Sequence, residues 1–213
     1  LPLSDFVDDQ VEVDFDTALP VNVGDFNGDC RGDLLFAVPT RSGNHNLTVL
    51  VSRVDGEKDN AVVRYTARSF ATDLKLTSLA VLDMNRNGNV DLVATAENTV
   101  YWFENKQKEL CRSLVKSDDT CRSQNDMCVA DNSFDFVNHT AFPFDKDRTI
   151  VVTDKYVRIS VGDYNIDGLP DILVPVKNDK TVSYVVLKND GDGTFKLDED
   201  ANKVVSEVSK GAV

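Results

Sequence analysis

Histidine and tryptophan are nearly absent from this chain of 213 residues, which has two histidines and one tryptophan. His45 and His139 provide too few imidazoles for a zinc centre, and no nucleophile and base are arranged around them as in a catalytic triad. Trp102 alone cannot supply the repeated aromatic platforms of a sugar-binding repeat protein. The composition therefore argues against an enzyme and against a lectin.

Basic residues and long apolar runs are also scarce. Lys and Arg number 23 against 36 Asp and Glu, a net charge of −13 that repels nucleic acid and anionic lipid surfaces. No stretch approaches the roughly 18 consecutive apolar residues of a membrane span. Leu1 is neither a methionine nor the start of a signal-peptide apolar segment, so we expect a mature or trimmed portion of a longer protein.

The four cysteines, Cys30, Cys111, Cys121 and Cys128, allow up to two disulfides in three connectivities. Cys111, Cys121 and Cys128 are close in sequence, so a local disulfide among them costs little loop entropy. We expect Cys121–Cys128 or Cys111–Cys128, with Cys30 either completing a second bridge or remaining free.

Two N-glycosylation sequons begin at Asn46 and Asn138. Together with the cysteines they favour the secretory pathway or the extracellular space. We expect Asn138 to be modified more readily, because it lies in an inserted segment whereas Asn46 precedes a strand.

One nine-residue polar pattern occurs three times, at residues 25–33, 83–91 and 163–171. Each copy follows a short apolar run and closes on an aspartate that begins another, so each is the connection of a β-hairpin. A further β-rich run follows each hairpin, at 47–51, 99–103 and 182–187. The first aspartates are 83 − 25 = 58 and 163 − 83 = 80 residues apart, which suits one antiparallel propeller blade per repeat.

The repeat predicts an all-β fold, with residues 1–213 forming part of one β-propeller domain of about three four-stranded blades. The second blade carries a cysteine-bearing insertion at about 106–155. A β-sandwich with acidic turns is the structural alternative. It does not, however, require the same loop three times at blade spacing.

The spacing of oxygen-bearing side chains within the loops is typical of a calcium site. Positions 1, 3, 5 and 9 carry Asp or Asn, and the carbonyl of position 7 adds an oxygen, as hard cations prefer. The predicted ligands are Asp25, Asn27, Asp29, Arg31 and Asp33 in loop one; Asp83, Asn85, Asn87, Asn89 and Asp91 in loop two; and Asp163, Asn165, Asp167, Leu169 and Asp171 in loop three.

The loops differ in two respects. Cys30 replaces glycine at position 6 of loop one, where we expect a distorted turn. Loop two has only Asp83 and Asp91 as carboxylates and should bind Ca²⁺ most weakly. The tripeptide 31–33 reads Arg-Gly-Asp, but Asp33 should face inward as a ligand, so we expect no adhesion-ligand role.

These loops resemble the FG-GAP repeats of integrin α-subunits, and the stretch 161–178 is similar to the T-cell immunomodulatory protein family, also called Linkin. Members of that family are type I membrane glycoproteins with a large propeller ectodomain. The resemblance implies an extracellular adhesion or receptor-like scaffold that binds protein partners. Because a closed ring needs at least four blades, the remaining blades should lie in flanking sequence or in a partner chain.

Two other functions stay open at this point. The chain could be a non-catalytic propeller domain of a larger secreted hydrolase or lyase. It could also be a carbohydrate-binding propeller, although Trp102 is its only tryptophan.

Overall fold

The computed structural model describes residues 19, 21–55, 61–107, 134–151, 158–178 and 181–198. In these ranges the chain forms thirteen β-strands and no helix, so none of the described residues lies in a helix that could cross a membrane.

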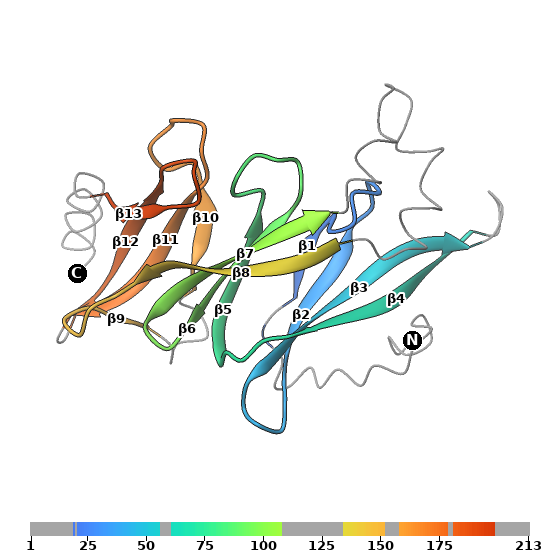
Figure 1. The fold of residues 1–213 in the computed structure, drawn as a ribbon, viewed down its shortest axis with the longest axis horizontal. Coiled ribbons are helices and arrows are strands. Elements are labelled where there is room, and N and C mark those ends of the chain that lie inside the picture. The colour runs from blue at the N-terminus through green and yellow to red at the C-terminus, as the bar shows by residue number, and fades with distance from the viewer. Residues whose placement is uncertain are drawn as a thin grey trace. The chain divides into compact units, whose positions relative to one another are not determined.

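The strands form three sheets (Figure 1). Apart from β9, the strands of each sheet pair in the order in which they follow one another in sequence. The first sheet has the order β1-β2-β3-β4. Its strands are β1 (Asn22–Gly24), β2 (Asp33–Pro39), β3 (His45–Asp55) and β4 (Val62–Ala71).

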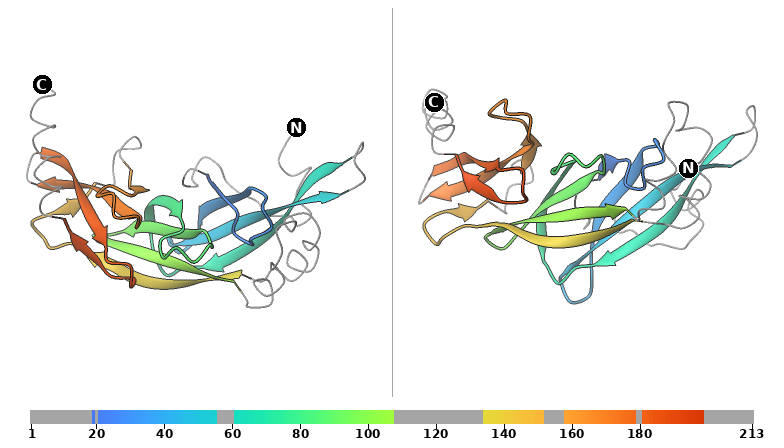
Figure 2. Two further views of the ribbon diagram at one scale, coloured as in Figure 1. Left: turned by 90° about the horizontal axis from the view of Figure 1, so that it is seen from above. Right: turned by 45° about the horizontal axis from the view of Figure 1, so that its top comes forward.

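The second sheet has the order β5-β6-β7-β8. Its strands are β5 (Leu76–Leu82), β6 (Asp91–Ala96), β7 (Thr99–Gln107) and β8 (Phe134–Pro143). The turned views show β8 beside β7 along the sheet (Figure 2).

The third sheet has the order β10-β11-β12-β13, with the short strand β9 also paired to β11. Its strands are β9 (Thr149–Ile150), β10 (Ser160–Gly162), β11 (Asp171–Asn178), β12 (Thr181–Asn189) and β13 (Phe195–Leu197). The prediction of an all-β fold built from three blade-like sheets is confirmed. The nine-residue loop connects β1 to β2 in the first sheet, β5 to β6 in the second and β10 to β11 in the third. The next strand along each sheet, β3, β7 or β12, is called its third strand below.

Part of the predicted insertion is integral to two sheets. Strand β8 supplies the fourth strand of the second sheet, and β9 pairs with β11 through Ile150 and Val176. Residues 108–133, which contain Cys111, Cys121 and Cys128, lie outside the described residues.

The chain divides into two compact units, Leu1–Leu74 with Asn105–Val137, and Lys75–Glu104 with Asn138–Val213. Aromatic packing stabilises the first. The ring centroid of Phe70 lies 5.5 Å from that of Phe134 and 5.1 Å from that of Phe136, and the Arg68 guanidinium carbon lies 4.9 Å from the centroids of Phe70 and Phe134.

The second unit has a continuous apolar core. Alternate residues of β11, Ile172, Val174 and Val176, are fully buried and pack in one cluster with Val93 and Trp102. Because side chains of a strand alternate between faces, this spacing places one apolar face of β11 in the core.

Gly193 lies directly against the core residue Trp102. It has φ +88°, and a Cβ there would lie 2.8 Å from Cζ3 of the indole. We expect Gly193→Ala to lower the free energy of unfolding by about 2 kcal/mol, from left-handed backbone strain and the steric conflict together. Gly43→Ala is the control, since Gly43 has φ +85° with no atom within 4 Å of a Cβ. It should cost about 1 kcal/mol. If urea unfolding gave the same loss of free energy for Gly193→Ala and Gly43→Ala, the predicted steric conflict between residue 193 and Trp102 would be wrong.

Candidate metal-binding loops

The three loops share one backbone conformation. In each, the residues at positions 4 and 6 have positive φ, and the values lie between 57° and 87°. These pairs are Gly28 and Cys30, Arg86 and Gly88, and Ile166 and Gly168. The expectation of a distorted turn at Cys30 is wrong, because Cys30 adopts the left-handed conformation of the glycines with φ 63°.

The position-1 carboxylate organises each loop by accepting the N–H groups of positions 5 and 6. In loop three, Asp163 accepts Asp167 N–H at 3.1 Å and Gly168 N–H at 2.8 Å. The same pairs occur for Asp25, with Asp29 and Cys30, and for Asp83, with Asn87 and Gly88.

The side chains at positions 3 and 5 continue this pattern. The position-3 amide oxygen accepts the N–H of position 5, and the position-5 oxygen accepts the N–H of position 7. In loop three these donors are Asp167, at 3.0 Å from Asn165 Oδ1, and Leu169, at 2.9 Å from Asp167 Oδ1. The equivalent bonds in the other loops join Asn27, Asp29 and Arg31, and Asn85, Asn87 and Asn89.

The position-9 aspartates, Asp33, Asp91 and Asp171, are fully buried. Each accepts the N–H of position 2 through Oδ2, at 2.9 to 3.1 Å. The Oδ1 atoms of Asp33 and Asp171 accept N–H groups of Ser52 and Asn189 on the third strands. The position-9 aspartate therefore ties the loop to the sheet.

Burial raises the pKa of Asp33 to about 7 against the opposing effect of its amide donors. Burial likewise raises the pKa values of Asp171 and Asp25. A bound cation would favour the ionised forms of these carboxylates. The Arg-Gly-Asp tripeptide places its aspartate in this buried position, where no receptor could reach the carboxylate.

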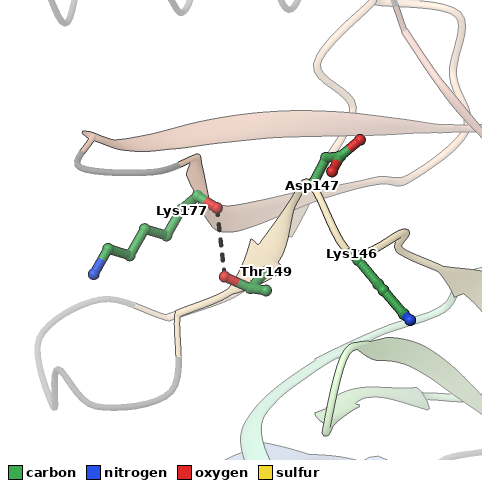
Figure 3. A pocket seen from close by; sticks show the side chains of 4 residues that line it. All are labelled: Lys146, Asp147, Thr149 and Lys177. Carbon is green, nitrogen blue, oxygen red and sulfur yellow. Dashed lines mark hydrogen bonds between the residues drawn. The ribbon is translucent and has the colours of Figure 1, made fainter.

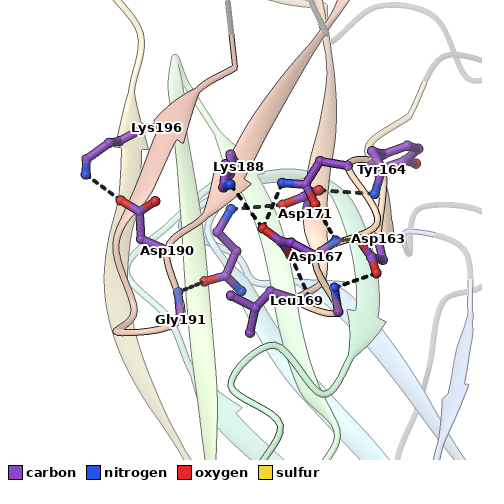
Figure 4. A network of polar contacts seen from close by, with 12 residues as sticks. Asp163, Tyr164, Asp167, Leu169, Asp171, Lys188, Asp190, Gly191 and Lys196 are labelled. Atoms are coloured by element: carbon purple, nitrogen blue, oxygen red, sulfur yellow. Dashed lines mark hydrogen bonds and ion pairs between the residues drawn. The ribbon is translucent and has the colours of Figure 1, made fainter. Parts of the chain in front are cut away.

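The oxygen atoms that the loops offer as ligands fit a hard cation such as Ca²⁺. In the described part of the chain, no three carboxylate, imidazole or thiolate side chains form a ready-made cluster. The loops instead combine carboxylates with amide and carbonyl oxygens, and an oxygen that accepts one N–H retains a second lone pair. In loop three the Lys188 ammonium lies 3.1 Å from Asp167 Oδ2, so this carboxylate already attracts a cation (Figure 4).

Buried asparagines on third strands contact the loop of the preceding sheet, and sequence reasoning missed them. In the first unit, Asn105 Nδ2 on β7 donates to the Phe26 carbonyl at 2.8 Å. In the second, Asn189 Nδ2 on β12 donates to the Met84 carbonyl, also at 2.8 Å. Phe26 and Met84 both occupy position 2, so the same bond occurs twice. The available signal was an asparagine two residues after a matched apolar residue, Phe103 or Leu187.

The position-2 residue of loop three is in a different environment. Tyr164 is 40% exposed, whereas Phe26 is 0% and Met84 is 1% exposed. Among the described residues, no asparagine donates to the Tyr164 carbonyl. Within the part of the chain that the structure describes, loop three therefore lacks the asparagine contact that covers the other two loops.

Cys30 is disulfide-bonded, and its partner lies outside the described residues. The sequence left open whether Cys30 forms a disulfide or remains a free thiol, and in the structure it forms a disulfide. The prediction of a local disulfide among Cys111, Cys121 and Cys128 concerns residues outside the described ranges.

The two sequons have different accessibilities. Asn138 is exposed on β8, the outermost strand of its sheet, rather than in a loop. Asn46 is half-buried on β3 between β2 and β4, and the Thr48 hydroxyl is hydrogen-bonded to that of Ser69 at 3.0 Å. We expect glycan at Asn138 and little at Asn46 when the protein is made in a secretory host. Glycopeptide mass spectrometry showing modification only at Asn46 would contradict this ranking.

Trp102 provides no open aromatic platform. It is buried, and its ring centroid lies 5.0 Å from that of His139. His139 Nε2 lies 3.2 Å from Glu104 Oε2. The indole therefore packs against other side chains and is not open for stacking on a sugar ring.

A polar pocket of about 460 Å³ lies elsewhere in the second unit (Figure 3). Its lining residues are Lys146, Asp147, Thr149 and Lys177. The Thr149 hydroxyl donates to the Lys177 carbonyl at 3.4 Å. The lining residues that the structure describes include no histidine or cysteine and no activated nucleophile.

The family model for the FG-GAP-like repeat matches residues 25–94. Two curated relatives are T-cell immunomodulatory protein homologs. The one from Plasmodium falciparum (isolate 3D7) is 30% identical over 195 residues, covering 78% of this chain and 26% of the relative. The one from Plasmodium yoelii yoelii is 27% identical over 197 residues, covering 78% and 27%.

The chain thus spans about a quarter of the length of these relatives. Neither the family description nor the relatives' names denote an enzyme. No solved structure matches the chain.

Proposed function

We propose, on the premise that this chain is an FG-GAP-repeat protein related to the T-cell immunomodulatory protein homologs, that it is an extracellular, calcium-stabilised β-propeller scaffold for protein–protein interaction. Its role is to present a rigid surface to a protein partner in adhesion or in a receptor-like ectodomain, without catalysis.

The observation that supports the calcium role is that all three loops have the same backbone conformation and the same hydrogen-bond pattern. All three share the positive-φ pair and the bonds from positions 5 and 6 to the position-1 carboxylate. A solvated acidic turn needs no such repetition. A cation at each loop would neutralise carboxylates that otherwise repel one another.

The extracellular location is supported by the Cys30 disulfide, because disulfides persist in oxidising compartments. The exposed sequon at Asn138 is consistent with passage through the secretory pathway.

Further blades are part of this proposal. Asn105 and Asn189 cover the loops of preceding sheets, so a further blade from flanking sequence or a partner chain should cover Tyr164 in the same way. Such a blade would carry an asparagine two residues after the third-strand residue equivalent to Phe103 or Leu187.

Isothermal titration of the chain with CaCl₂ tests the calcium role. We expect saturable binding with Kd of about 10⁻⁴ to 10⁻³ M, typical of extracellular modules. MgCl₂ is the control and should bind more weakly, because Mg²⁺ demands a stricter octahedral geometry. The absence of binding heat at millimolar Ca²⁺ would contradict the proposal.

A further inference from the structure

The third strand of each sheet places one equivalent residue next to its own loop. The paired positions Leu34 with Leu50, Leu92 with Phe103, and Ile172 with Leu187 align the three sheets. The residues that follow on the third strands are Val51, Glu104 and Lys188. This position, which we call the loop-facing position, is therefore neutral, acidic and basic in the first, second and third sheets.

Glu104 brings a third carboxylate to loop two. Its Oε1 accepts the Nδ2 amide of Asn85, position 3 of the loop, at 3.1 Å. This bond orients the Asn85 amide so that Oδ1 accepts the Asn87 N–H within the loop. The Glu104 side chain is only 12% exposed, and its Oε2 lies 3.2 Å from His139 Nε2.

Lys188 has the opposite effect on loop three. Its Nζ lies 3.1 Å from Asp167 Oδ2, an oxygen of the position-5 carboxylate (Figure 4). Asn165 Nδ2 donates to the same oxygen at 2.8 Å. A Ca²⁺ ion that used this oxygen would have to displace the ammonium or bind beside it.

Loop one has no charge at the loop-facing position, because Val51 is buried there. A positively charged side chain near this loop comes from the loop itself, because Arg31 Nη1 lies 3.7 Å from Asp29 Oδ2.

We propose that the loop-facing residue sets the calcium affinity of its loop, with Glu104 raising that of loop two and Lys188 lowering that of loop three. The inference rests on the proposed calcium role and reverses the order expected from the loops alone, in which loop two is weakest. A unit charge a few ångströms from a divalent ion in water changes its binding by about tenfold. Loop three has one more carboxylate than loop two, but Lys188 offsets it.

Two glycine amides allow the loops to be followed separately. Gly88 N–H donates to Asp83 Oδ2 at 2.7 Å, and Gly168 N–H donates to Asp163 Oδ2 at 2.8 Å. A cation bound to either position-1 carboxylate will move the matching ¹H–¹⁵N resonance. Titration of the ¹⁵N-labelled chain with CaCl₂ thus gives one midpoint per loop.

We expect Gly88 to respond at lower Ca²⁺ than Gly168 in the natural sequence. Lys188→Met should lower the Gly168 midpoint about tenfold and leave Gly88 unchanged. Glu104→Gln, which keeps a hydrogen-bond acceptor but removes the charge, should raise the Gly88 midpoint severalfold and leave Gly168 unchanged.

The matched control is Lys196→Met, because the Lys196 ammonium pairs with Asp190 outside the loop. It should move neither midpoint. If both glycines respond but Lys188→Met leaves the Gly168 midpoint within twofold, the loop-facing position does not set affinity and the inference is wrong while the calcium role stands. If neither glycine responds to Ca²⁺ in any variant, the calcium role fails and this inference fails with it.

Discussion

Asn189→Ala should lower the free energy of unfolding by about 3 kcal/mol. The Asn189 side chain is almost completely buried. Its Nδ2 donates to the carbonyls of Met84 at 2.8 Å and Pro170 at 3.0 Å, and its Oδ1 accepts the Gly191 N–H at 2.9 Å. Alanine would remove all three bonds and leave buried carbonyls without a donor, which costs more than the loss of a solvent-exposed bond.

Two further asparagines calibrate that result. Asn105→Ala should cost about 1 to 2 kcal/mol, because it removes the buried hydrogen bond from Asn105 Nδ2 to the Phe26 carbonyl. Asn44, in the turn between β2 and β3, makes no side-chain hydrogen bond to the described residues, and Asn44→Ala should change stability by less than about 0.5 kcal/mol. Urea unfolding of the three variants checks the order. Equal midpoints for Asn189→Ala and Asn44→Ala would show that this loop contact does not stabilise the chain.

The loops and strands were predictable because their signals are local. Each loop repeats the same side-chain spacing, and each flanking apolar run alternates or continues as a strand does. The runs at 47–51, 99–103 and 182–187 accordingly lie within β3, β7 and β12. Here a repeated nine-residue pattern outweighed the weak propensity of any single segment.

The contacts that join the loops to other strands were not predictable from spacing alone. Asn105 lies 79 residues from Phe26, and Asn189 lies 105 residues from Met84. Recognising these bonds requires the register of three sheets, which fixes which residues occupy equivalent third-strand positions. The same register places Glu104 and Lys188 beside their loops.

Cys30 and β8 illustrate two other limits. Glycine preference at position 6 led to the expectation of distortion, but the position-1 carboxylate accepts the Cys30 N–H at 2.7 Å and favours the same turn. Strand β8 is separated from β7 by a long cysteine-bearing segment, so local sequence did not connect the two strands. Long-range pairing of this kind leaves no short-range signal.

Calcium should stabilise the native chain by about 1 to 2 kcal/mol for each loop that it occupies at 2 mM, given Kd values of about 10⁻⁴ to 10⁻³ M. The reason is mass action, since the folded loops bring together oxygens that the unfolded chain does not. In a chain of this size each kcal/mol raises the melting temperature by about 2 to 4 °C. Occupancy of more than one loop should therefore give a shift of several degrees.

Asp163→Ala distinguishes a metal effect from the loss of hydrogen bonds. Asp163 accepts the N–H groups of Asp167 and Gly168, so alanine will destabilise loop three even without calcium. The informative quantity is the increase in melting temperature that Ca²⁺ produces in each protein. That increase should be smaller in Asp163→Ala than in the natural sequence, because one loop no longer binds the ion.

The most direct test of the calcium-stabilised scaffold is thermal unfolding of the chain in 2 mM CaCl₂, about the extracellular level assumed above, and in EDTA. The natural sequence should melt several degrees higher in calcium, and Asp163→Ala should show a reduced increment. Identical melting temperatures of the natural sequence in calcium and in EDTA would show that the three loops are acidic turns and that calcium does not stabilise this fold.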